Sequence, residues 1–209
     1  MRELKADSLK RLGKTEFEGF CWRLLVEERR RYFAPQTVHL DPPSGADIAD
    51  GGRDLLAIVR QRPRTLSDWG LIPDRTGEVW YSCKSSSDDG SDTKTPRGWA
   101  EQIRRDLDPS PRIIDAQVNP PIVKADADTT LETRKQQGPP HALLQALADG
   151  GSYFILVNVP AAKQREFRHE IQILFEFWIQ RGLDQAVNLD GRIELFDAHK
   201  LAEIYRDNP

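Results

Sequence analysis

The chain has 209 residues, of which 38% are hydrophobic and 30% are charged, and its formal net charge at pH 7 is −3. This length suits one domain with a large core, so we expect residues 1–209 to form a single domain with a heavily charged surface. No apolar run in the sequence approaches the length of a membrane span, and residues 1–5 lack the apolar core of a signal peptide. We therefore expect a soluble, cytoplasmic protein with no membrane partner.

The small acidic excess counts mildly against nucleic-acid binding, which usually shows as a basic excess. The basic residues are nevertheless clustered in three segments, Arg29–Arg31, Arg60–Arg64 and Lys94–Arg105. Carboxylates gathered around a metal ion would also lower the total charge. The charge alone therefore does not exclude a DNA-binding protein.

Cysteine and histidine give no pattern typical of a zinc site. Cys21 and Cys83 lie in apolar segments without metal-ligand spacing, and the four histidines are scattered. We interpret both cysteines as reduced core residues, which fits a cytoplasmic location.

The first half of the chain predicts one helix followed by two strands. The helix covers residues 15–31, with Thr15 as N-cap and Glu18 three residues later at the capping-box position. After a loop rich in turn formers, residues 54–59 form the short apolar run of a buried central strand. Residues 78–84 form the next strand.

The second half continues the alternation of helices and strands around a proline-rich stretch, residues 109–140, which we interpret as an irregular insertion with room for one short helix. In chain order we expect a helix over 95–107, a helix over 141–147, a strand over 153–159, a long helix that ends at Gly182, a strand over 193–196 and a helix over 197–205. This alternation predicts an α/β fold in which helices flank a central mixed sheet.

Three short segments occur in an order that carries chemical meaning. Phe17-Glu18 lies in the first helix, Gly51-Gly52-Arg53-Asp54 leads into the first strand, and Ser82-Cys83-Lys84 ends the second. This arrangement resembles the Mrr-type restriction-endonuclease-like family, the PD-(D/E)XK nucleases, over roughly the first half of the chain. The resemblance implies a restriction-endonuclease-like fold with Asp54, Lys84, Glu18 and Ser82 in the catalytic site.

Phosphodiester hydrolysis explains these residue types. It needs a hard cation with oxygen ligands, usually Mg²⁺ or Mn²⁺, to offset phosphate charge and to acidify the attacking water. Asp54 is suited to ligate that ion, and Lys84 to orient the water and stabilise developing charge. Glu18, Asp50 and Glu101 are further candidate metal ligands.

Each of these residues also has a purely structural interpretation. Glu18 would serve only a capping box with Thr15, Asp54 would be an ordinary carboxylate at a strand edge, and Lys84 would extend to solvent. Asp50, before the glycine pair, is typical of a turn. We favour the site role for Asp54 and Lys84, leave both roles open for Glu18, and favour the turn role for Asp50.

Ser82 is the main departure from the family pattern, which has an acid or Gln two residues before the lysine. Three interpretations follow: Ser82 holds the metal through a water, another acid such as Glu101 or Glu18 supplies the missing ligand, or the domain has lost catalysis. We prefer the second, and Gln102 is a further candidate for the same pocket.

The expected function is Mg²⁺-dependent cleavage of double-stranded DNA with little sequence specificity, as in the effector domains of bacterial anti-phage defence proteins. Such effectors work with a C-terminal NTPase or sensor region or with a partner protein. Cutting both strands needs two active sites, which favours a homo-oligomer. The rival hypothesis is a noncatalytic nuclease-like module that binds DNA or a protein partner.

Overall fold

A five-stranded mixed sheet forms the centre of the computed structural model, which describes residues 5–43, 53–62, 70–85, 113–115, 122–124, 141–159 and 191–207. The strands are β1 (Val38–Asp41), β2 (Leu55–Val59), β3 (Gly77–Lys84), β6 (Ser152–Val157) and β7 (Ile193–Phe196), and they lie side by side in that order. The helices are α1 (Ala6–Leu9), α2 (Lys14–Tyr32), α5 (His141–Ala148) and α7 (Ala198–Asp207). The expected α/β class with a mixed sheet flanked by helices is confirmed.

The sheet changes from antiparallel to parallel at β3. Strands β1, β2 and β3 pair antiparallel, whereas β3, β6 and β7 are parallel. The C-terminal ends of the three parallel strands therefore share one edge with the N-terminal end of β2. This edge brings residues 54 and 84 together.

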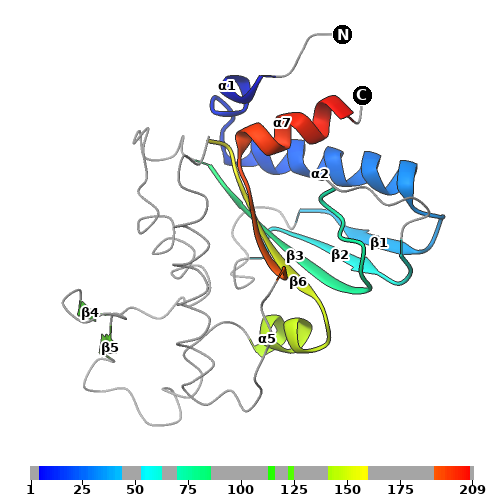
Figure 1. The fold of residues 1–209 in the computed structure, drawn as a ribbon. Coiled ribbons are helices and arrows are strands. Elements are labelled where there is room, and N and C mark those ends of the chain that lie inside the picture. Colours follow the sequence, from blue (N-terminus) through cyan, green and yellow to red (C-terminus); the bar gives the residue numbers. More distant parts are fainter. Residues whose placement is uncertain are drawn as a thin grey trace.

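Two layers of helix cover the sheet (Figure 1). Helices α2 and α7 pack on one face, where the Phe20 and Tyr205 rings lie 6.0 Å apart, and Tyr81 and Cys83 of β3 join their core. Helix α5 covers the other face, where Leu143 packs with Trp80 of β3. Side chains of successive β3 residues thus point into opposite helix layers, as strand geometry requires.

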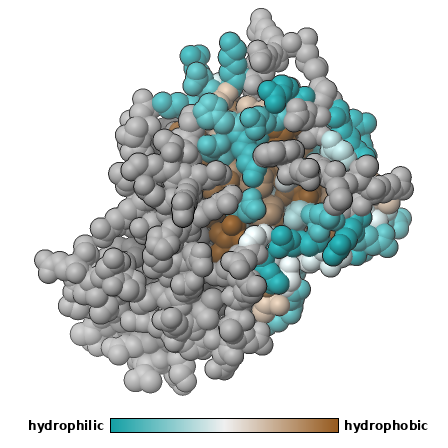
Figure 2. Space-filling model, in the orientation of Figure 1, coloured by the Kyte–Doolittle hydropathy of each residue, from teal (hydrophilic) through white to brown (hydrophobic). Residues whose placement is uncertain are grey.

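Hydrophobic side chains from both layers make the interior. In Figure 2 the described residues around the rim of the visible face are mainly hydrophilic, and hydrophobic residues show between them. Among the described residues, no helix is long and apolar enough to cross a bilayer.

The strands expected over 54–59, 78–84, 153–159 and 193–196 are confirmed as β2, β3, β6 and β7, with ends that differ by no more than two residues. The helices expected over 15–31, 141–147 and 197–205 are confirmed as α2, α5 and α7. The helices expected over 95–107 and before Gly182 fall outside the described residues.

Three local features were not expected. The sequence pattern did not predict α1 or the edge strand β1. Within 109–140, where we expected an irregular insertion with room for a short helix, the described residues form an antiparallel pair, β4 (Ile113–Asp115) and β5 (Ile122–Lys124).

Candidate functional site

Asp54 is fixed at the edge of the sheet by the backbone of β3. Its N–H donates to the carbonyl of Tyr81 at 2.8 Å, which extends the β2–β3 ladder by one residue. Its Oδ2 accepts a hydrogen bond of 2.6 Å from the N–H of Cys83. The carboxylate therefore has a defined position, which an unrestrained strand-edge side chain would lack.

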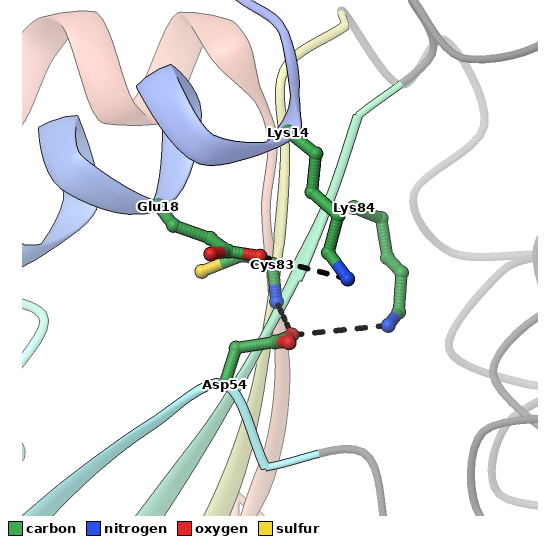
Figure 3. A network of polar contacts seen from close by, with 5 residues as sticks. All are labelled: Lys14, Glu18, Asp54, Cys83 and Lys84. Atoms are coloured by element: carbon green, nitrogen blue, oxygen red, sulfur yellow. Dashed lines mark hydrogen bonds and ion pairs between the residues drawn. The ribbon is translucent and has the colours of Figure 1, made fainter. Parts of the chain in front are cut away.

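Lys84 ends β3 and brings a buried cation to the same place. Its Nζ lies 3.8 Å from Oδ2 of Asp54, and only 8% of its side chain is exposed (Figure 3). Removing an ammonium group from water is costly unless a negative charge compensates it. The alternative in which Lys84 extends to solvent is wrong.

Glu18 faces the sheet from α2 rather than capping that helix. The N-cap is Gly13, whose N–H donates to Oε2 of Glu16 at 3.1 Å, so the capping box with Thr15 and Glu18 is wrong. Glu18 lies further along the helix and is 9% exposed. Its Oε1 lies 3.8 Å from Nζ of Lys14, one turn earlier.

Asp54 and Glu18 both lie beside Cys83, Asp54 on its backbone N–H and Glu18 nearer its sulfur (Figure 3). A hydrogen bond with Cys21 raises the pKa of Cys83 well above its usual value, and burial and the negative charges of Asp54 and Glu18 raise it further. This direction of the pKa shift agrees with the position of both acids around Cys83 in Figure 3. Both cysteines are free and buried, which confirms them as core residues, and a protonated thiol is a poor metal ligand.

Ser82 occupies the position where the family pattern has an acid. It pairs with Ile155 of β6 and is 0% exposed, and its hydroxyl has no hydrogen-bond partner among the described residues. By strand alternation it lies on the face opposite Cys83. A hydroxyl buried in this way does not replace the missing carboxylate.

A buried polar tie beside the site was not recognised in the sequence. The carbonyl oxygen of Leu12, just before α2, accepts from Nδ2 of Asn158 at 3.1 Å and from Oγ of Ser85 at 3.0 Å. Asn158 also donates to Oγ of Ser85 at 3.0 Å, and its N–H donates to the carbonyl of Lys84 at 3.2 Å. The tie fixes the start of α2 against the ends of β3 and β6.

The described residues bring together Asp54, Lys84 and Glu18 from the sequence-based prediction, with Lys14 as an addition. Asp50, Glu101 and Gln102 lie outside the described residues. Within the described part of the chain, no group of three or more His, Cys, Asp or Glu is arranged to hold a metal ion. The donors that are present are carboxylate oxygens, which suit Mg²⁺ or Mn²⁺ better than zinc.

Comparisons of the chain with models of known protein families, with curated proteins and with solved structures find no match.

Proposed function

We propose that the protein is a metal-dependent endonuclease that cleaves double-stranded DNA with low intrinsic sequence specificity. One observation supports this most strongly: the Asp54 carboxylate is fixed by the Cys83 N–H and faces the buried ammonium of Lys84, while Glu18 approaches from α2. A fixed acid beside a buried lysine is the pairing that phosphodiester hydrolysis needs. The finer fold assignment, restriction-endonuclease-like, belongs to the same proposal.

Each residue has a distinct role in the proposed site. Asp54 and Glu18 would hold Mg²⁺ or Mn²⁺, with Asp50 and Glu101 as candidates for the remaining ligands. The bound ion would supply charge neutralisation at the phosphate and a more acidic water. Lys84 would orient the attacking water and stabilise negative charge on the phosphate as it develops.

The biological setting follows from the same proposal. Cleavage with little sequence preference suits an anti-phage effector in the cytoplasm, provided that another component controls it. A C-terminal NTPase or sensor region, or a partner protein, would supply that control. A homo-oligomer would place two active sites on one duplex.

The second candidate function is a noncatalytic module that binds DNA or a protein partner. The observation that favours it is Ser82, which is fully buried and lacks the carboxylate that the nuclease pattern requires. In this alternative Asp54 and Lys84 form a structural ion pair at the sheet edge.

A plasmid-nicking assay separates the two functions. We expect the wild-type protein to nick supercoiled plasmid with Mg²⁺ or Mn²⁺ and to be inactive in EDTA. We expect Asp54→Asn, which keeps the side-chain shape and removes the charge, to lose nicking and to bind Mn²⁺ more weakly by calorimetry. Equal Mn²⁺ binding by both proteins would remove Asp54 from the metal site, and an inactive wild type would favour the noncatalytic module.

A further inference from the structure

Two of the three basic segments of the sequence meet at one end of the sheet, and the proposed reaction uses neither. Helix α2 runs from the candidate site to the far end of the sheet, and its last turn carries Arg29–Arg31 (Figure 1). Strand β2 begins just after Asp54, and Arg60 and Arg62 follow its last residue. Arg60 is about 20 Å from Asp54 at 3.3 Å per residue of extended chain. These five arginines, which we call the distal arginine cluster, therefore lie away from the candidate site.

Backbone hydrogen bonds hold the two segments of the cluster together. The N–H of Arg60 donates to the carbonyl of Thr37 at 2.8 Å. The N–H and the hydroxyl of Thr37 both donate to the carbonyl of Ala34, at 3.2 and 2.7 Å. The N–H of Phe33 donates in turn to the carbonyl of Arg29 at 3.1 Å. The turn from α2 into β1 therefore fixes the end of α2 beside the end of β2.

The side chains of the distal arginine cluster are all exposed. Of the two acids in the last two turns of α2, Glu27 pairs with Arg30 at 2.8 Å, and Glu28 is buried with both oxygens on backbone N–H groups. These acids balance at most part of the five positive charges. Like charges gathered on one surface repel each other and destabilise the folded chain, and a bound polyanion would remove that repulsion.

We propose that the distal arginine cluster is a second DNA-binding surface, which contacts the phosphate backbone of a duplex away from the cleavage site. Arginine suits this ligand, because its guanidinium group stays charged and binds a phosphate through two parallel hydrogen bonds. Phosphate contacts carry no sequence information, which agrees with low sequence specificity. The inference rests on the proposed function for the choice of DNA as the ligand, and it adds a surface that needs no metal.

Duplex binding in EDTA tests the cluster separately from cleavage. Fluorescence anisotropy of a labelled duplex is measured over a range of salt, and melting temperatures check that each variant is folded. The test proteins are Arg29→Gln/Arg31→Gln, Arg60→Gln/Arg62→Gln and the combination of all four changes. The matched control is Arg23→Gln/Arg206→Gln, which removes two exposed arginines outside the cluster, one in the middle of α2 and one near the end of α7.

We expect each pair of changes in the cluster to lower the slope of log affinity against log salt by about 1–2, since each lost phosphate contact removes about 1. The four changes together should lower the slope by the sum of the two pairs. The control pair should change it by less than either pair.

The possible failures of this inference and of the proposed function are distinct. If wild type does not bind the duplex at low salt, or if the cluster variants bind it as the control does, the inference is wrong, whereas plasmid nicking by wild type would still support the nuclease. If the cluster variants lose binding but wild type does not nick plasmid in Mn²⁺, the surface stands and the cleavage function fails. Poly-L-glutamate is the probe for an acidic protein partner: tighter binding of it than of the duplex, lost in the same variants, would overturn the assignment to DNA.

Discussion

The burial of Ser82 bears on which residue supplies the second carboxylate of the candidate site. The Ser82 hydroxyl is fully buried in β3, two residues before Lys84, and Glu18 of α2 lies near Cys83, whose N–H binds Asp54 (Figure 3). This geometry favours the interpretation in which another acid replaces the one missing at position 82.

We therefore predict that Ser82→Glu does not increase plasmid nicking. It should also lower the free energy of unfolding by several kcal/mol, roughly the cost of burying a poorly compensated charge. Denaturant unfolding and nicking rates check this, and Ser82→Gln separates size from charge. A clear rise in nicking with Ser82→Glu would mean that the site lacks an acid and that Ser82 is a degenerate ligand.

Glu28 is a buried carboxylate of α2 that lies away from the proposed chemistry. Its two oxygens accept hydrogen bonds from the N–H groups of Leu71 at 2.7 Å and Ile72 at 2.9 Å. Burial raises its pKa from 4.5 to about 7, although the two backbone hydrogen bonds oppose the shift. Gly70 packs directly on this carboxylate, since a methyl group there would lie 1.9 Å from Oε1 of Glu28.

The raised pKa fixes the sign of a pH effect on stability. Between pH 4.5 and about 7 the unfolded chain has lost the Glu28 proton and the folded protein keeps it, so stability falls as pH rises through this window. The loss should reach about 3 kcal/mol and stay constant above the window. In Glu28→Gln this contribution is absent.

Urea unfolding at several pH values isolates the effect by difference. The stability of Glu28→Gln relative to wild type should improve by about 3 kcal/mol from pH 4 to pH 8. A relative stability that stays constant with pH, or that moves the other way, would contradict the raised pKa.

At the scale of elements, the tie between Leu12, Ser85 and Asn158 determines where α2 stands on the sheet. Asn158 is fully buried and bonds both Leu12 and Ser85. Because α2 begins at Lys14, two residues after Leu12, the tie also positions Lys14 and Glu18 relative to Lys84.

We predict that Asn158→Ala lowers the free energy of unfolding by about 2 kcal/mol, since it leaves buried polar groups with fewer partners. It should also slow nicking although it changes no residue that touches the phosphate. The matched control is Ser152→Ala in β6, because the buried Ser152 hydroxyl has no partner among the described residues. Equal effects of the two changes on stability and on nicking would show that the tie has no special role.

The elements also show what the sequence could and could not predict. Strands β2 and β6 were predictable because each is an apolar run long enough to fill a buried strand. Strand β3 was predictable from the β-branched and aromatic residues at its centre, Val79-Trp80-Tyr81. Strand β1 has only two apolar residues, Val38 and Leu40, between polar ones, and α1 is a single turn, so neither has a distinct pattern. The start of α2 was misplaced because its cap uses Glu16 and the backbone of Gly13, whereas Thr15 is the stronger sequence signal.

The candidate site was also predictable only in part. The proximity of Asp54 and Lys84 was predictable, because Asp54 starts one predicted strand and Lys84 ends the next. Two adjacent strands can place such residues at the same edge of a sheet. Asn158 was missed because its role depends on contacts with Leu12 and Ser85 across the fold, which no local spacing marks. Lys14 pairs with Glu18 four residues later, a spacing that the sequence shows, but its place beside the site depends on how α2 packs on the sheet.

For the whole molecule, the arrangement of charge matters more than the total of −3. Lys14 and Arg31 lie at opposite ends of α2, roughly 25 Å apart at 1.5 Å per residue. Helix α2 therefore carries basic side chains at both the proposed site and its far end.

The most direct test of the central claim is the single-turnover rate of plasmid nicking in Mn²⁺ by wild type and Lys84→Met. This change keeps the packed stem of the lysine and removes only its charge. We predict a rate lower by roughly 10²–10³-fold, or about 3–4 kcal/mol in the barrier. The melting temperature should fall, because Asp54 loses its buried partner, whereas Mn²⁺ binding should be retained or strengthened.

Lys200→Met is the matched control, because Lys200 is also partly buried and lies 3.4 Å from a glutamate oxygen, Oε2 of Glu194. It should nick plasmid at the wild-type rate. A Lys84→Met protein that is folded, binds Mn²⁺ and nicks as fast as wild type would contradict the proposed role of the Asp54–Lys84 pair in DNA cleavage.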